Sequence, residues 1–166
     1  MEIQALVGKR WRRAAATTSD VNGAFSSTIA PKRTRALRAR FPGSPQLRPG
    51  TSPRFTVKVK PVVTLSRLRT RRRAGAATTF RGRVTPAKRY VWQVLQVRKR
   101  GRFRTVGAKR LRVKRDGSFR GLFVPAQSAT YRVYVVAKPD RITVRGASRI
   151  YSLGVRRSRG GGAVAP

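Results

Sequence analysis

The sequence contains no histidine and no cysteine, and only four of its 166 residues are acidic. Without histidine the chain lacks the commonest general base and the commonest metal ligand, which excludes Ser-His-Asp and Cys-His arrangements. Without cysteine it has neither a disulfide framework nor a thiolate metal site. Composition leaves a Ser–Lys pair open, but no pattern places one. We predict that the protein is not an enzyme and has no catalytic, cofactor-binding or metal-binding residues.

The four carboxylates are Glu2, Asp20, Asp116 and Asp140, and they cannot readily build a glycosidase pair within one domain. Two of them are better explained as turn residues. Asp116 precedes a glycine, which accepts a positive φ without steric cost, so the pair predicts a hairpin turn. Residues 20–23, DVNG, look like the start of a calcium loop, but the terminal bidentate glutamate of such a loop is absent. We interpret this stretch as a second hairpin turn.

Long hydrophobic runs are also missing. No apolar stretch approaches the roughly 20 residues needed to span a bilayer, so no membrane span is predicted. Residues 1–7 are followed at once by GKRWRR, without the apolar centre of a signal peptide. Taken alone, the missing signal favours the cytoplasm.

Short runs of β-branched and aromatic residues, bounded by turns or charges, dominate the second half of the chain. Such runs are typical of successive antiparallel strands, and residues 78–85, TTFRGRVT, alternate as a half-buried strand does. A basic loop is expected at residues 67–77. The seven expected strands are residues 61–66, 78–85, 91–98, 103–113 (broken near Gly107), 118–124, 130–136 and 148–155.

The first sixty residues carry the same pattern in the same order, which indicates a tandem repeat. EIQ at 2–4 aligns with VLQ at 94–96, Trp11 with Phe103, and residues 37–41 with 131–135. The offset drifts from 92 to 96, as a two-residue gap in each of two loops would produce.

The first copy has no counterpart of the strands at 61–66 and 78–85. We therefore expect residues 1–60 to be a truncated repeat that lacks its first two strands, residues 61–157 a complete seven-strand repeat, and residues 158–166 a disordered tail. A missing N-terminal domain in a longer parent protein would explain the truncation. It would also account for the absent signal peptide.

The motifs that carry a resemblance are GRVTP at 82–86, GRFRTV at 101–106, DGSFRGLFVP at 116–125, YRVYV at 131–135 and SRIYSLGV at 148–155. The chain resembles the immunoglobulin-like or fibronectin-type-III-like repeats of secreted proteins from high-GC Gram-positive bacteria. This resemblance implies an all-β chain of two tandem immunoglobulin-like sandwiches, the first incomplete, in an extracellular or cell-surface spacer or stalk. Tyr131 occupies the place of a tyrosine-corner residue, and ordinary core packing is the alternative.

Positive charge is the one abundant chemical feature. Lys and Arg number 41 and the formal net charge is +37, which attracts polyanions such as nucleic acid or anionic wall polymers. The competing explanation is a compositional bias without function. Arginines that alternate with apolar residues inside strands, such as Arg81 and Arg120, are expected on a solvated face.

Two true runs of basic residues are the candidate polyanion-binding positions. One surrounds Trp11, which we expect to pack in or against the core because it aligns with Phe103. The other lies in the loop expected at 67–77. The candidates are Lys9, Arg10, Arg12, Arg13, Arg67, Arg69, Arg71, Arg72 and Arg73.

The leading hypothesis is a non-catalytic structural or interaction module of a secreted or surface protein. Its partner would be an anionic cell-wall polymer or another polyanion, bound without specificity. The alternative is a basic nucleic-acid-binding protein, and nucleic acid is expected to bind at low salt under either hypothesis. We expect the charge to act diffusely, because basic residues are spread along the whole chain.

Overall fold

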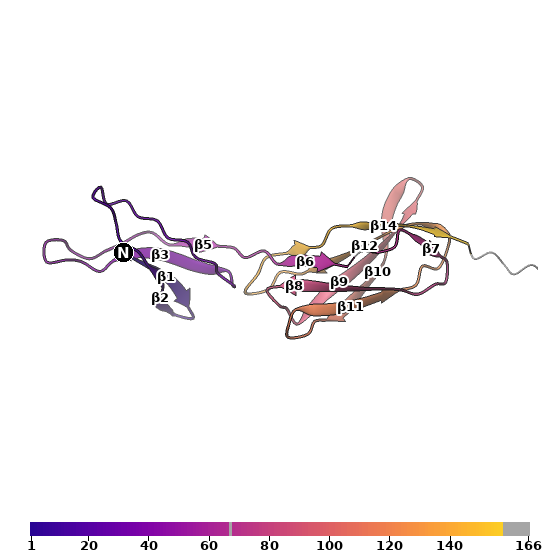
Figure 1. Ribbon diagram of the computed structural model, residues 1–166, viewed down its shortest axis with the longest axis horizontal. Helices are drawn as coiled ribbons and strands as arrows, with labels where there is room; N and C mark the ends of the chain where they lie inside the picture. Colours follow the sequence, from indigo (N-terminus) through magenta and orange to yellow (C-terminus); the bar gives the residue numbers. More distant parts are fainter. Residues whose placement is uncertain (67, 158–166) are drawn as a thin grey trace, which may run out of the picture. The chain divides into compact units, whose positions relative to one another are not determined.

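The computed structural model describes residues 1–66 and 68–157, which form fourteen β-strands and no helix (Figure 1). The predicted all-β class is confirmed. Two earlier expectations, the tail at 158–166 and the candidate Arg67, lie outside the described residues.

The chain divides into two compact units. The first comprises residues 1–60 together with the loop 139–144, and the second comprises residues 61–138 and the chain from Arg145 onward. The loop 139–144 is held in the first unit by backbone bonds from Thr34 N to Ile142 O at 2.7 Å and from Val144 N to Val59 O at 2.9 Å. Residues 139–144 are flanked in the sequence by residues of the second unit, and no pattern in the sequence indicates that they belong to the first.

Unit 1 contains one sheet. Its strands are β1 (Glu2–Val7), β2 (Arg10–Ala16), β3 (Arg35–Phe41), β4 (Gly50–Thr51) and β5 (Phe55–Val57). The sheet order is β2-β1-β3-β4, and β5 also pairs with β3. The strands form because apolar residues alternate with arginines in β3 and the turn at Gly8, whose φ is +64°, reverses the chain between β1 and β2.

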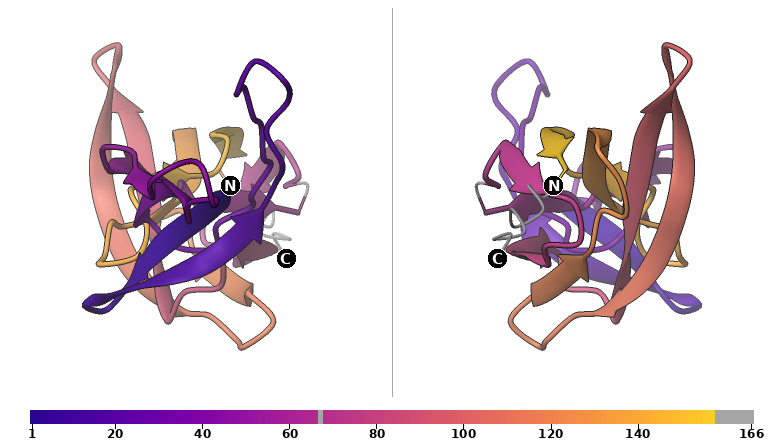
Figure 2. Two further views of the ribbon diagram at one scale, coloured as in Figure 1. Left: turned by 90° about the vertical axis from the view of Figure 1, so that its left-hand side faces the viewer. Right: turned by 90° about the vertical axis from the view of Figure 1, so that its right-hand side faces the viewer.

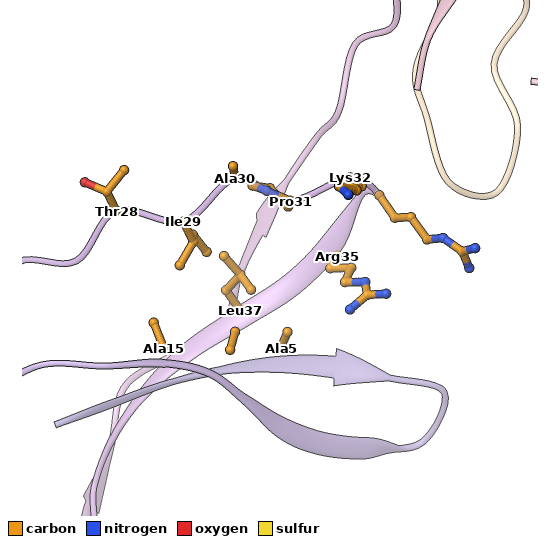
Figure 3. A pocket seen from close by; sticks show the side chains of 11 residues that line it. Ala5, Ala15, Thr28, Ile29, Ala30, Pro31, Lys32, Arg35 and Leu37 are labelled. Atoms are coloured by element: carbon orange, nitrogen blue, oxygen red, sulfur yellow. The ribbon is translucent and has the colours of Figure 1, made fainter. Parts of the chain in front are cut away.

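One face of the unit 1 sheet is only loosely covered. Ala5 and Leu37 are its fully buried apolar residues among those described, and the irregular segment that contains Ile29 and Pro31 lies across from them (Figure 3). An open cavity of about 780 Å³ remains between the segment and the sheet. No second sheet closes this face within the described part of unit 1.

Unit 2 contains two sheets. The six-stranded sheet has the order β10-β9-β12-β14-β7, with β13 paired to β12, and the three-stranded sheet has the order β11-β8-β6. The long β9–β10 hairpin forms a twisted ribbon (Figure 2). The bounds are β6 (Val62–Leu65), β7 (Arg71–Arg73), β8 (Thr78–Thr85), β9 (Tyr90–Lys99), β10 (Arg102–Arg112), β11 (Ser118–Phe123), β12 (Ala129–Ala137), β13 (Gly146–Ala147) and β14 (Tyr151–Arg156).

The two sheets of unit 2 share one core. Phe80 and Phe119 from the small sheet and Val133 and Leu153 from the large sheet belong to a single buried cluster. The buried residues of unit 2 include Phe80, Phe119, Phe123, Tyr131, Val133 and Leu153, whereas Leu95 and Tyr151 are only half-buried. Burial of apolar side chains from both layers is the main stabilising contribution, at about 25 cal/mol per Å² of apolar surface.

Two strand predictions need correction. The basic stretch expected to be a loop at 67–77 contains β7, which pairs in parallel with β14. The closing strand expected at 148–155 begins only at Tyr151 as β14; a separate short strand, β13, precedes it, and Ser148 lies between the two. The expected break at Gly107 occurs as a β-bulge, because the register against β9 shifts between Thr105 and Gly107.

The same local contact recurs in both units. Ser52 donates its backbone N–H to Ala39 O at 3.0 Å, and its Oγ accepts a bond from Ala39 N at 2.9 Å. Ser148 makes both bonds with Val135, at 2.9 Å and 3.0 Å. Each residue of the second pair follows its counterpart by 96 positions, since 148 − 52 = 96 and 135 − 39 = 96.

The strand register of the two units provides a second comparison of the repeats. Gln4 lies opposite Arg38 as Gln96 lies opposite Arg132, and these residues differ by 92 and 94 positions (96 − 4 and 132 − 38). The difference of 94 continues at residue 39, because Ile3 lies opposite Ala39 as Leu95 lies opposite Val133. Relative to this register, Ser148 bonds two residues further along β12 than Ser52 does along β3. A displacement of two residues along a strand leaves every side chain on its original face, because the strand period is two.

Candidate polyanion-binding surfaces

Strand β7 organises the candidate residues Arg71, Arg72 and Arg73. They pair in parallel with Gly154, Val155 and Arg156 of β14, and Gly154 N donates to Thr70 O at 2.7 Å. Successive side chains of a strand point to opposite faces. Arg71 and Arg73 are accordingly exposed, whereas Arg72 is half-buried beside the buried Val155.

This strand pair brings five arginines to one shallow concavity of about 650 Å³. It is lined by Arg71, Arg72, Arg73, Ala76, Arg156 and Arg157. Arg156 and Arg157 were missed in the sequence, because they lie more than 80 positions from β7 and join it only through the parallel pairing. Within residues 1–66 and 68–157, no carboxylate lines the concavity. Guanidinium groups bind phosphate and carboxylate with two parallel N–H bonds, so this surface can hold oxyanions.

The remaining members of that run are less involved. Arg69 is exposed in the segment before β7 and does not line the concavity. The Nε of Arg72 is buried and has no hydrogen-bond acceptor. A buried donor without an acceptor is unfavourable, so the Arg72 stem serves mainly to cover apolar surface at the end of the sheet.

The run around Trp11 is divided between the two faces of the unit 1 sheet. Lys9 lies in the β1–β2 turn, and in the strand register Arg12 lies opposite Ala5 while Trp11 lies opposite Leu6. Arg10 and Arg12 therefore share the face of Ala5, and Trp11 with Arg13 lies on the other face. Lys9, Arg10, Arg12 and Arg13 are all exposed.

Trp11 does not pack in the core. Its ring is half-buried and lies beneath the guanidinium of Arg38, whose Cζ is 4.2 Å from the ring centroid. The ring is thus covered by a cation and is not an open platform for a nucleobase. The expectation of core packing fails because β2 is an edge strand and Trp11 lies on the face opposite Leu37.

A third cluster of basic residues lies in unit 2, where the chain passes from β10 to β11. It surrounds a groove of about 1170 Å³ whose floor includes Leu111, Val113 and Phe119. Its seven basic residues are Arg81, Lys109, Arg110, Arg112, Lys114, Arg115 and Arg120. Several of these were predicted to lie on a merely solvated face. The sequence could not bring them together, because the groove depends on the approach of β10 and β11 from different sheets.

Like charges face each other at this groove. Arg120 lies directly opposite Arg81 in the β11–β8 register, a cross-strand arrangement that is destabilising unless an anion lies nearby. Asp116 supplies one carboxylate to the neighbourhood, and its Oδ2 is 3.9 Å from an Arg83 nitrogen. An exposed pair of this length contributes little.

Asp116 and Asp20 lie in turns, as predicted, but the Asp20 turn joins no hairpin, because the next described strand after β2 begins only at Arg35. Asp116 Oδ1 accepts bonds from the backbone N of Ser118 at 3.0 Å and from its Oγ at 2.8 Å, and these bonds hold the pKa of Asp116 below its ordinary value. Asp20 Oδ1 accepts bonds from Asn22 N and Ala24 N, each at 2.9 Å. These carboxylates are therefore occupied with backbone groups of their own turns.

Three further findings concern the chemistry of the chain. Within residues 1–66 and 68–157, no three His, Cys, Asp or Glu side chains gather as a metal site would require. The same residues include no helix with the length and apolarity to cross a membrane. No protein-family model matches the chain, and no curated protein matches it either.

Proposed function

We propose that the chain is a non-catalytic module of a secreted or cell-surface protein, built from two tandem immunoglobulin-like units, which spaces its neighbours and contacts anionic polymers. The strand order of unit 2 supports the fold assignment. Its first, second and fifth major strands (β6, β8 and β11) form one sheet, and β9, β12 and β14 lie side by side in the other. This is the division of strands A, B, E and C, F, G in immunoglobulin-like sandwiches.

Tyr131 adds a specific feature in favour of this fold. Its side chain is 4% exposed, and its hydroxyl oxygen accepts a bond from the backbone N–H of Gln127, four residues upstream, at 3.3 Å. A tyrosine near the start of strand F that bonds back to the preceding corner is the tyrosine-corner arrangement. Core packing and the corner bond are therefore combined in one residue, which favours an immunoglobulin-like unit.

The tandem character rests on shared topology and shared contacts. β2-β1-β3 in unit 1 follows the order of β10-β9-β12 in unit 2. The double bond of Ser52 with Ala39 has its counterpart in Ser148 and Val135. We interpret unit 1 as an incomplete copy, because no strands equivalent to β6 and β8 occur among its described residues.

The observation that carries the binding function is the dispersal of cations over three surfaces, two of which have no carboxylate among their described lining residues. With 41 basic and four acidic side chains, at least 37 cations lack an exclusive carboxylate partner (41 − 4 = 37). The β7–β14 concavity, the β10–β11 groove and the β1–β2 hairpin each present several of them. Such a surface binds polyanions through released counterions and without sequence readout.

A salt titration with grouped variants tests this proposal. Three triple variants each replace arginines by glutamine: Arg71, Arg72 and Arg73; Arg10, Arg12 and Arg13; and Arg81, Arg83 and Arg120. Fluorescence anisotropy with a labelled phosphodiester polymer measures affinity at salt concentrations from about 50 to 200 mM, over which affinity should fall steeply. We expect each triple variant to weaken binding by a similar, modest factor.

Binding to nucleic acid would be the better explanation under one outcome. If a single triple variant abolished submicromolar binding that otherwise persisted against competitor near physiological salt, a localised nucleic-acid site would replace the diffuse surface. Failure of the unmodified protein to bind any polyanion at low salt would refute the binding function itself.

A further inference from the structure

The outer face of the six-stranded sheet in unit 2 carries aromatic rings with cations stacked over them. The distances from cation to ring centroid are 3.6 Å for Arg132 over Phe103, 3.8 Å for Lys138 over Trp92 and 4.5 Å for Arg110 over Tyr90. All lie within the roughly 6 Å at which a cation and a ring attract each other. None of these six residues was predicted as a binding residue from the sequence.

Strand register places the three stacks on the same face. Trp92 lies opposite Arg110 on one side and Val136 on the other, and Gln96 lies opposite Arg132. Residues opposite each other share a face, as do residues two apart on one strand. The alternate residues of β9 and β12, such as Val91 and Val133, are buried in the core. The stacked cations therefore face away from the core.

The arrangement recurs in unit 1. Arg38 lies over Trp11 at 4.2 Å, and these residues precede Arg132 and Phe103 by 94 and 92 positions (132 − 38 and 103 − 11). In unit 1 the Nε of Arg38 also donates to Gln4 Oε1 at 2.9 Å, which fixes the guanidinium further. A stack that occurs at corresponding places in both sheets is a feature of the unit and not of one loop.

Stacking changes what these cations can do. A ring beneath the side chain restricts its rotamers before any partner arrives, so less conformational entropy is lost on binding than for a free surface cation. A guanidinium that lies flat on a ring keeps its N–H groups in its own plane, where the exposed ones can reach oxyanions. The Nε of Arg132 is buried and is not one of these. Half-buried rings covered by cations also leave little free aromatic surface for a nucleobase.

We propose that these stacked cations are the preferred contact points of the chain for a linear polyol-phosphate polymer, whose repeated phosphates carry negative charge without bases. The inference rests on the proposed polyanion contact and refines it, because it distinguishes the stacked cations from the other basic residues. Charge complementarity selects the partner, and the covered rings favour a polymer without bases over single-stranded nucleic acid.

The decisive variants remove rings and leave every charge in place. Phe103→Leu and Trp92→Leu, alone and combined, abolish two stacks in the full chain. Tyr134→Leu is the matched control, because Tyr134 is a half-buried ring on the same face of β12 with no cation over it among the described contacts. Arg132→Lys keeps the charge but loses the planar fork. Thermal melts establish that each variant remains folded.

Labelled poly(glycerol phosphate) is the probe, measured by anisotropy across salt concentrations. Each ring removal should weaken binding about threefold and the double variant about tenfold, which corresponds to restored freedom of one or two long side chains. The slope of log affinity against log salt should stay unchanged, since no charge is lost. Tyr134→Leu should change affinity less than twofold, and Arg132→Lys should resemble Phe103→Leu.

Three other outcomes would overturn the inference. Equal effects of Trp92→Leu and Tyr134→Leu, or none from either, would show that stacking does not matter, even while the grouped arginine variants weaken binding as the proposed function requires. A parallel fall in the salt slope would mean that ring loss acts by displacing charges. An oligo(dT) of equal phosphate number that bound tenfold tighter, and lost more on ring removal, would assign the face to bases.

Discussion

The two units have sheets of similar strand order, yet they differ greatly in how those sheets are covered. Of the fully buried apolar residues that are described, unit 1 contributes only Ala5 and Leu37, and unit 2 contributes all the others. In unit 2 a second sheet lies over the first and completes one core. In unit 1 the irregular segment around Ile29 leaves an open cavity (Figure 3). Strand pairing alone therefore does not provide a core, because burial requires an opposing layer.

The largest difference is expected when the two units are expressed as separate fragments. Residues 61–157 expressed alone should unfold in one cooperative transition, because every described residue of their core cluster lies within the fragment and none lies in the loop 139–144. Residues 1–60 alone should be poorly folded or aggregate, since one sheet with open edges buries too little apolar surface. Circular dichroism melts and sedimentation measure both. A sharp two-state melt of residues 1–60 would contradict the comparison.

The second prediction compares one phenylalanine from each unit. Phe119 is 4% exposed in the core of unit 2, whereas Phe55 of β5 is 55% exposed. Phe119→Ala should destabilise by about 3–5 kcal/mol through lost burial and a new cavity, whereas Phe55→Ala should change stability by less than about 0.5 kcal/mol. Urea denaturation of the full chain, followed by near-ultraviolet circular dichroism, checks both. Comparable losses would mean that unit 1 has a core of its own.

The strands of unit 2 were predictable where apolar and charged residues alternate. β8 occupies Thr78–Thr85 as expected, because Phe80 and Val84 face the core between arginines. β7 was not predictable, because three consecutive arginines carry no alternation and the parallel partner lies far along the chain. For the same reason Arg156 could not be assigned to a binding surface. Single-strand patterns reveal local periodicity, whereas these surfaces arise from pairing between distant strands.

The candidate site shows the same limit. The basic runs correctly located the positive charge along the chain. Because side chains alternate between the two faces of a strand, however, Arg72 and Trp11 lie on the faces opposite to those of their sequence neighbours. The groove between β10 and β11 combines cations from three strands and the intervening turn. Several of its members are unremarkable in the sequence, since Arg81, Arg112 and Arg120 each follow an apolar residue within a strand pattern. Only the approach of two sheets makes them one surface.

The third prediction compares the glycines of the two turns that hold Asp20 and Asp116. Gly23 has a φ of +78° and Gly117 a φ of +83°, so an alanine at either position is strained by about 1–2 kcal/mol. A Cβ at Gly117 would also lie 2.5 Å from Val84 O, whereas one at Gly23 would meet nothing within 4 Å. Gly117→Ala should therefore be the more destabilising by at least about 1 kcal/mol. Urea denaturation measures Gly117→Ala, and amide hydrogen exchange in the turn at residues 20–24 measures Gly23→Ala. Equal effects would imply that the backbone near Val84 relaxes freely.

The smallest expected effect concerns the serine bonds that both units share. Ser148 is 8% exposed, and its Oγ accepts the bond from Val135 N in buried surroundings, whereas Ser52 makes the same bond with Ala39 N at an exposed position. Ser148→Ala leaves a buried N–H without its acceptor and should cost about 1–3 kcal/mol. Ser52→Ala should cost less than about 0.5 kcal/mol, because water can replace the hydroxyl. Amide exchange reports each site directly: protection of Val135 should fall strongly in Ser148→Ala, and that of Ala39 only slightly in Ser52→Ala. If Ala39 lost as much protection as Val135, its backbone would have to be shielded from water, and the open face of unit 1 would be better covered than its cavity indicates.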